Sequence, residues 1–336
     1  MTIDYALIWA ALIAFVVLAY IVLDGFDLGV GILFPWVKGQ AHRDQMMNSV
    51  APVWDGNETW LVLGGGGLFA VFPLAYSIIM PALYAPFIVM LLALVFRGVA
   101  FEFRFKSRRH QWFWDVAFAG GSTVAAFAQG VAMGALVQGI PVAGRAYAGG
   151  WWDWLSPFSL LTGAALVVGY ALLGATWLML KTEGDVAKFA LRAARSLGVA
   201  LLLLILVVSV WTPFLHEHFL QKWLAWPDRL LVLPVPALVL LCAALFFKGL
   251  SQQRPLMAFL SVQGLFVLSY MGLLVSFFPY IVPSAVTLWQ AAAPDNSLKF
   301  LLVGAVVLLP MILSYTAYAY WVFRGKVGPS HQYHSR

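Results

Sequence analysis

Charged residues and cysteines are both scarce in this sequence. Asp, Glu, Lys and Arg make up 10% of the 336 residues, whereas soluble domains carry about 25%. The single cysteine, Cys242, stands within an apolar run, which excludes a disulfide, a thiolate cluster and a CxxC redox pair within the chain. Hydrophobic residues make up 62% and the mean hydropathy is +0.88. The composition is therefore that of an integral membrane protein.

Histidine is missing from the middle of every long apolar run. A haem b with bis-His or His/Met ligation requires an axial imidazole within the bilayer. Copper and non-haem iron sites require clustered His and carboxylate ligands. We therefore expect this chain to hold no metal and to do no redox chemistry itself. The six histidines lie in loops, in the C-terminal tail or at the end of a run: His42, His110, His216, His218, His331 and His334.

Nine apolar runs are long enough to cross a bilayer as helices, which requires about 20 residues each. Barrel strands would be about 10 residues long with alternating polarity, so the fold class expected is an all-α integral membrane protein. No long linker divides the chain, and residues 1–336 form a single polytopic membrane domain. The expected spans are 6–34, 54–73, 79–101, 112–138, 158–181, 193–215, 229–249, 256–279 and 299–323.

Basic residues are distributed unevenly between the two sets of loops that these spans define. The loops after spans one, three, five and seven, together with the C-terminal tail, hold 16 of the 20 Lys and Arg residues. The positive-inside rule places those loops in the cytoplasm. The N-terminus is then periplasmic and the C-terminus cytoplasmic. Because the membrane accounts for the net charge of +6, no nucleic-acid partner is expected.

Asp24 and Asp27 stand in the later half of the first span, in the stretch LDGFDLGVG. Acids in hydrocarbon are rare, usually face a bundle interior, and mark ion or proton paths. Residues three apart share one face of a helix. Gly25 and Gly29 form a small-xxx-small pair that lets another helix approach closely. The pattern favours a buried proton relay or ion site; the alternative is that the acids hydrogen-bond a neighbouring helix or cap an early helix end.

Asp55 and Glu58 stand at the start of the second span, again three residues apart. Both lie near the same membrane face as Asp24 and Asp27, so all four are candidate proton-path residues. Helix capping is the alternative for both, because acids favour helix N-termini. Arg97, near the end of the third span, is a candidate partner for one of the acids. Its alternative is contact with anionic lipid.

Five stretches resemble subunit II of the cytochrome bd-type quinol oxidases, including the cyanide-insensitive branch. The most specific elements are DGFDLGVG and WDGNETW, and the resemblance runs nearly end to end. The stretches are residues 24–31, 48–73, 96–104, 277–293 and 315–327.

The resemblance implies a partner and a reaction. In this family subunit I carries haems b and d and oxidises quinol, while subunit II is haem-free and folds as two four-helix bundles with one peripheral helix. The complex reduces dioxygen to water with cytoplasmic protons, without pumping, in the bacterial inner membrane. Asp24 and Asp55 match the family's proton-path acids, Asp27 is a companion, and Glu58 stands where other members can carry a neutral residue. Some members hold a structural quinone in this subunit, and a small accessory subunit is a further candidate partner.

The function expected is therefore that of a haem-free oxidase subunit that stabilises subunit I and supplies a proton path. Two other interpretations remain open. A stand-alone proton-coupled transporter would also have buried acids and helices interrupted by Gly and Pro. A membrane scaffold would use the acids only to bridge helices.

Overall fold

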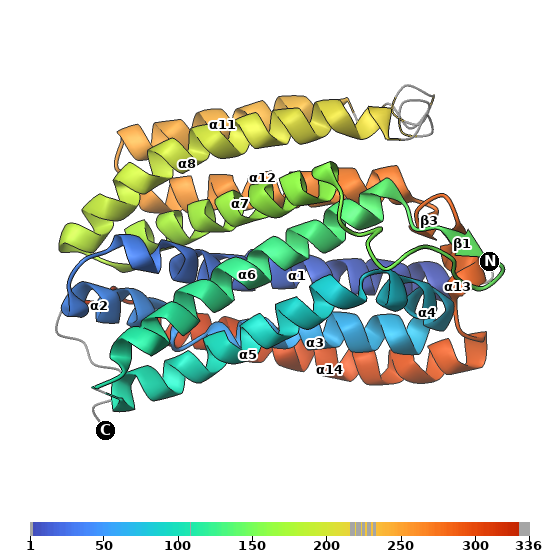
Figure 1. Ribbon diagram of the computed structural model, residues 1–336, viewed down its shortest axis with the longest axis horizontal. Coiled ribbons are helices and arrows are strands. Elements are labelled where there is room, and N and C mark those ends of the chain that lie inside the picture. Colours follow the sequence, from blue (N-terminus) through green and yellow to red (C-terminus); the bar gives the residue numbers. More distant parts are fainter. Residues whose placement is uncertain are drawn as a thin grey trace.

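The computed structural model describes residues 3–107, 109–215, 219, 223, 226, 230 and 233–328. Within them, nine long helices run along a common axis (Figure 1). They are α1 (Tyr5–Leu33), α3 (Trp54–Val71), α5 (Tyr84–Lys106), α6 (Gln111–Gln138), α7 (Pro157–Lys181), α8 (Gly184–Trp211), α11 (Pro234–Ser251), α12 (Pro255–Phe277) and α14 (Asp295–Val322).

Eight of these helices are long and apolar enough to cross a membrane, which confirms the all-α membrane fold. The ninth, α3, is less apolar because Asp55, Asn57 and Glu58 lie in its first turns. It ends at Val71, and Pro73 starts α4 (Pro73–Ala82) after a break at Phe72. Proline disfavours the helical conformation of the residue before it, so α3 ends two residues before the expected span 54–73 does. The expected span 79–101 is divided instead, because α4 ends at Ala82 and α5 begins at Tyr84.

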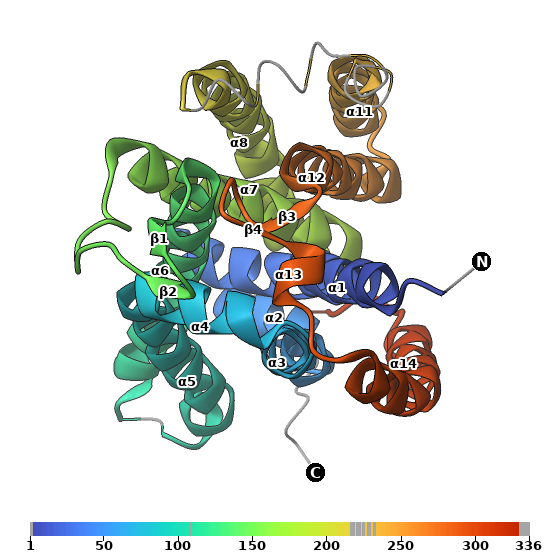
Figure 2. The ribbon, with the colours of Figure 1, turned by 90° about the vertical axis from the view of Figure 1, so that its right-hand side faces the viewer.

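By chain order and helix contacts, the long helices of the described residues fall into two groups and one peripheral helix, which are seen end-on in Figure 2. One group contains α1, α3, α5 and α6, and the other contains α7, α8, α11 and α12. Helix α14 lies at the edge beside α1 and α3, and none of its most apolar stretch is buried. This arrangement agrees with the two bundles and peripheral helix that the resemblance implies.

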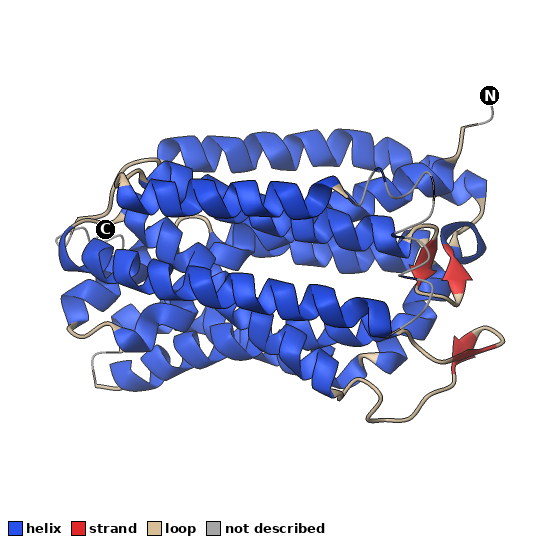
Figure 3. Ribbon diagram, turned by 90° about the horizontal axis from the view of Figure 1, so that it is seen from above, coloured by secondary structure: helices blue, strands red, loops and turns tan. Residues whose placement is uncertain are grey.

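Short elements close the two ends of the bundle. Two hairpins lie at the end where the described N-terminal segment begins, and α2 lies at the other end with the last described residues (Figures 1 and 3). The sequence did not predict the hairpins or α2, and α8 begins nine residues before the expected span at 193. The short elements are η1 (Phe34–Trp36), α2 (Gln40–Val50), β1 (Val142–Ala143), β2 (Ala146–Tyr147), η2 (Thr212–Phe214), β3 (Tyr280–Val282), β4 (Val286–Thr287) and α13 (Leu288–Ala291).

Polar caps hold the hairpin end together. Asp4 caps α1 by accepting a hydrogen bond from the Leu7 N–H at 3.0 Å and another from the Trp289 indole at 2.8 Å. These two donors lower the pKa of the Asp4 carboxyl. Tyr147 donates to the Asp153 carboxylate at 3.0 Å; partial burial and this neighbouring charge raise the pKa of Tyr147 to about 12.

Candidate functional site

Close contact between α1 and α7 buries the acidic stretch of α1. Every residue from Asp24 to Gly31 is buried. A Cβ on Gly29 would lie 1.8 Å from the Tyr170 carbonyl oxygen, and one on Gly174 would lie 2.2 Å from the Gly29 carbonyl carbon. The two backbones therefore touch where neither helix has a side chain. This packing holds Asp24 and Asp27 inside the protein.

Arg97 of α5 joins Asp24 to Glu58. Its Nη2 donates to Asp24 Oδ1 at 3.0 Å, and its Nη1 lies 3.4 Å from Glu58 Oε2. The side chains of Arg97 and Asp24 are fully buried, whereas 23% of the Glu58 side chain is exposed. The guanidinium also lies 5.9 Å from the ring centres of Trp54 and Phe101. The structure thus gives Asp24 a cation, and Glu58 occupies the outer edge of the same group.

Asp27 has a neutral partner instead. Asn57 of α3 donates from Nδ2 to Asp27 Oδ2 at 2.6 Å and to the Leu23 carbonyl at 3.2 Å. The Tyr320 hydroxyl of α14 donates to Asn57 Oδ1 at 3.0 Å. Neither Asn57 nor Tyr320 was predicted from the sequence. The signal for Asn57 was its position in the WDGNETW motif, between the two acids already selected.

A second row of polar groups approaches Asp24 from α6 and α7. Tyr20 lies one helical turn before Asp24 on α1. Gln129 donates to the Tyr20 hydroxyl at 2.6 Å, and the Tyr170 hydroxyl donates to Gln129 Oε1 at 3.1 Å. These three residues were also missed. They extend the polar interior from the carboxylates into the middle of the bundle.

Asp55 does not join the buried cluster. It lies in the first turn of α3 and is exposed. Within the described part of the chain, no hydrogen bond or ion pair to its carboxylate is found; its backbone carbonyl accepts from the Thr59 hydroxyl at 3.0 Å. The structure therefore brings together Asp24, Asp27, Glu58 and Arg97 and leaves Asp55 on the surface.

A separate ion network lies toward the α2 end of the bundle. Arg104 donates to Asp115 Oδ1 and to Asp44 Oδ1, each at 2.6 Å, and Arg43 donates to Asp115 Oδ2 at 2.8 Å. Arg104 is fully buried and lies 5.3 Å from the ring centre of Phe34. The network connects α2, α5 and α6. Since every charge in it has an opposite partner, we interpret it as structural.

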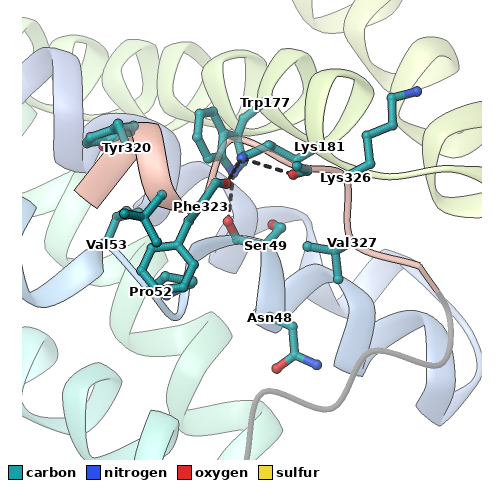
Figure 4. A pocket seen from close by; sticks show the side chains of 12 residues that line it. Asn48, Ser49, Pro52, Val53, Trp177, Lys181, Tyr320, Phe323, Lys326 and Val327 are labelled. Carbon is teal, nitrogen blue, oxygen red and sulfur yellow. Dashed lines mark hydrogen bonds between the residues drawn. The ribbon is translucent and has the colours of Figure 1, made fainter. Parts of the chain in front are cut away.

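A cavity of about 200 Å³ opens at the same end (Figure 4). The Lys181 ammonium lies in its wall, donating to the carbonyls of Phe323 and Gly325 and lying 5.3 Å from the Trp177 ring centre. Tyr320 contributes another part of the wall. The lining residues are Asn48, Ser49, Pro52, Val53, Trp177, Lys181, Tyr320, Val322, Phe323, Gly325, Lys326 and Val327.

Potential metal ligands are dispersed in the described residues, which contain no group of three or more His, Cys, Asp or Glu side chains placed to hold an ion. His42 lies on α2, where its ring Nδ1 donates to the Lys38 carbonyl oxygen at 3.0 Å, and His110 is the N-cap of α6. The other four histidines, including His216 and His218, fall outside the described residues.

Known proteins resemble this chain over nearly its full length. The sequence pattern of the family described as cytochrome bd terminal oxidase subunit II matches residues 5–323. Cytochrome bd-I ubiquinol oxidase subunit 2 of Escherichia coli (strain K12) is 29% identical, with 97% of this chain and 96% of the relative covered. Cytochrome bd ubiquinol oxidase subunit 2 of Bacillus subtilis (strain 168) is 28% identical, with 95% and 96% covered.

A solved structure shares the fold. A chain of bd oxidase from Geobacillus thermodenitrificans superposes with a TM-score of 0.76, covering 96% of this chain and 99% of that chain at 17% identity. The long apolar helices, the shared fold and the family match all agree. The chain is therefore a multi-pass protein of the bacterial inner membrane and belongs to the cytochrome bd terminal oxidase subunit II family.

Proposed function

We propose that this chain is the haem-free subunit of a quinol:dioxygen oxidoreductase and supplies a path for protons from the cytoplasm. Haems b and d belong to the partner, subunit I, which this chain stabilises. The observation that carries the proposal is the buried cluster of Asp24, Asp27, Glu58 and Arg97. Ionisable side chains are energetically costly within a membrane, and where they occur they mainly mark the paths of ions or protons.

The charges within the cluster give the acids different roles. One guanidinium lies near two carboxylates, Asp24 at 3.0 Å and Glu58 at 3.4 Å. Asp24 is therefore the buried acid that has a counter-charge, Arg97. Among the described residues, Asp27 has only an amide donor, and we propose that it is the group that accepts and releases a proton.

Access to the cluster comes from the surface acids. Glu58 is partly exposed and Asp55 is exposed, both in the first turns of α3. We propose that Asp55 collects protons at the cytoplasmic surface and that Glu58 leads inward to Asp24 and Asp27. The orientation is inferred from the basic loops, which favour a cytoplasmic position for this end of the bundle and a periplasmic N-terminus. Reduction of one O₂ to two waters consumes four electrons, supplied by quinol, and four protons; their uptake from one side makes the enzyme electrogenic without pumping.

One purification separates this proposal from a stand-alone transporter. The chain is isolated from its native membrane with its partners, and a visible spectrum is recorded. Haem bands that follow a co-purifying larger subunit are the expected result. A colourless chain that purifies alone and moves a solute together with protons would overturn the proposal.

A further inference from the structure

Tyr320 and Asn57 connect the peripheral helix α14 to the buried carboxylate on α1. Tyr320 O–H donates to Asn57 Oδ1 at 3.0 Å, and Asn57 Nδ2 donates to Asp27 Oδ2 at 2.6 Å. Asn57 is buried. Its bond to Tyr320 joins residues 263 apart in the sequence, and its bond to Asp27 joins residues 30 apart. Tyr320, Asn57 and Asp27 are therefore linked by two consecutive hydrogen bonds.

The surroundings of Asn57 permit one orientation of its amide. On the α1 side it meets two acceptors, the Asp27 carboxylate and the Leu23 carbonyl. A carbonyl oxygen turned toward either would be repelled, so the NH₂ group must face α1. On the opposite side, the Tyr320 hydroxyl donates to the amide oxygen. Tyr320 thereby fixes Asn57 as a donor to Asp27.

The segment after α14 holds Tyr320 in place. Lys181 donates to the carbonyls of Phe323 and Gly325, and the Val327 N–H donates to the Lys181 carbonyl at 2.7 Å. Gln45 of α2 donates to the Val327 carbonyl at 2.7 Å. These bonds attach the end of α14 to α7 and α2, three to seven residues beyond Tyr320. Figure 4 shows Tyr320 and Lys181 among the side chains that line the cavity.

We propose that Tyr320 and Asn57 are positioning residues that set how readily Asp27 takes up a proton. A fixed N–H donor favours the ionised carboxylate over the neutral acid. The charged and titratable groups that face Asp27 are Asp24 of α1, Glu58 of α3, Arg97 of α5 and Tyr320 of α14. Arg97 contacts the other two acids, so the Asn57 amide is the donor that acts on Asp27 directly.

The part of this inference that concerns turnover rests on the proposed proton path, but its main test does not. The C=O stretch of the protonated Asp27 carboxyl is followed by infrared spectroscopy of the purified complex between low and high pH. The band is assigned by its loss in Asp27→Asn. In Asn57→Leu, which removes the donor, the pH midpoint of the band is expected to rise by about one unit, a tenfold change in proton affinity.

Tyr320→Phe tests whether the hydroxyl acts through the amide. Its midpoint is expected to rise by the same amount or less, and the double variant Asn57→Leu/Tyr320→Phe is expected to match Asn57→Leu alone. Residues in one hydrogen-bonded network give such non-additive effects. The matched control is Tyr318→Phe, whose side chain is exposed on the same helix; its midpoint should not move.

The outcomes are distinct. Additive shifts in the double variant, or an unchanged midpoint in Asn57→Leu, would overturn the positioning role. If the midpoints shift as expected while Asp27→Asn retains full oxygen consumption, the positioning role stands and the proposed proton path fails. If both hold, the pH profile of oxygen consumption moves in the same direction as the band.

Discussion

Arg97 Nη2 lies 3.0 Å from Asp24 Oδ1, whereas Asp27, three residues further along α1, contacts an amide and, among the described residues, no cation. Both carboxylates are fully buried. The same helix face therefore presents one acid with a counter-charge and one without. This difference, rather than the spacing of the two acids, is the basis for the separate roles proposed for them.

Asp27→Asn should slow oxygen consumption by about 100-fold, because the amide cannot take up and release a proton. The change is isosteric, so the haem spectrum and the yield of assembled complex should stay as in the wild type. Steady-state oxygen consumption with a soluble quinol measures the effect. Wild-type turnover in Asp27→Asn would refute the relay role of this residue.

Arg97→Met should destabilise the subunit by about 3–5 kcal/mol, because it leaves Asp24 charged, buried and without its partner. The loss is measured as a lower thermal midpoint of the complex in detergent. The double variant Arg97→Met/Asp24→Leu removes both charges and should recover most of the stability without recovering activity. If the single variant is as stable as the wild type, the ion pair contributes nothing to holding α5 against α1.

Asp55→Asn should reduce oxygen consumption while leaving the thermal midpoint and the haem content unchanged. Asp55 is exposed, and its carboxylate makes no hydrogen bond or ion pair within the described residues. A drop in oxygen consumption would therefore indicate a role in proton entry. Asp185→Asn is the matched control, since Asp185 is also exposed in the first turn of a helix, α8. Equal activity in the two variants would remove Asp55 from the path, and loss of haem in Asp55→Asn alone would make the residue structural.

Gly29→Ala should lower the thermal midpoint, with a cost of about 1–3 kcal/mol that is typical of overpacking. The added methyl group would lie 1.8 Å from the Tyr170 carbonyl oxygen and would force α1 away from α7. Gly272→Ala on α12 is the control, because its Cβ would meet no atom within 4 Å. An equal response from both glycines would show that the α1–α7 contact is not what holds the acidic stretch in place.

Much of the architecture could be read from composition and periodicity alone. A run of about 20 apolar residues has few alternatives to a membrane-spanning helix, since the backbone must satisfy its hydrogen bonds within the segment. The acids of α1 and α3 could be selected for a related reason, because burying charge in hydrocarbon is costly. Two other features could not be predicted from hydrophobicity. Helix α2 lies between two spans and has mixed polarity, and the break at Phe72 depends on a single proline.

The sequence by itself determined that the chain is a helical membrane protein. It also determined that acidic side chains, which are energetically costly to bury in hydrocarbon, lie near one end of the first two long helices. Only the tertiary structure decided which groups meet those acids. Arg97 is 73 residues from Asp24, and Tyr320 is 263 residues from Asn57. No local pattern encodes such pairs, because they depend on how α3, α5 and α14 pack around α1. The same packing left Asp55 outside the cluster, although its spacing from Glu58 repeats that of Asp24 and Asp27.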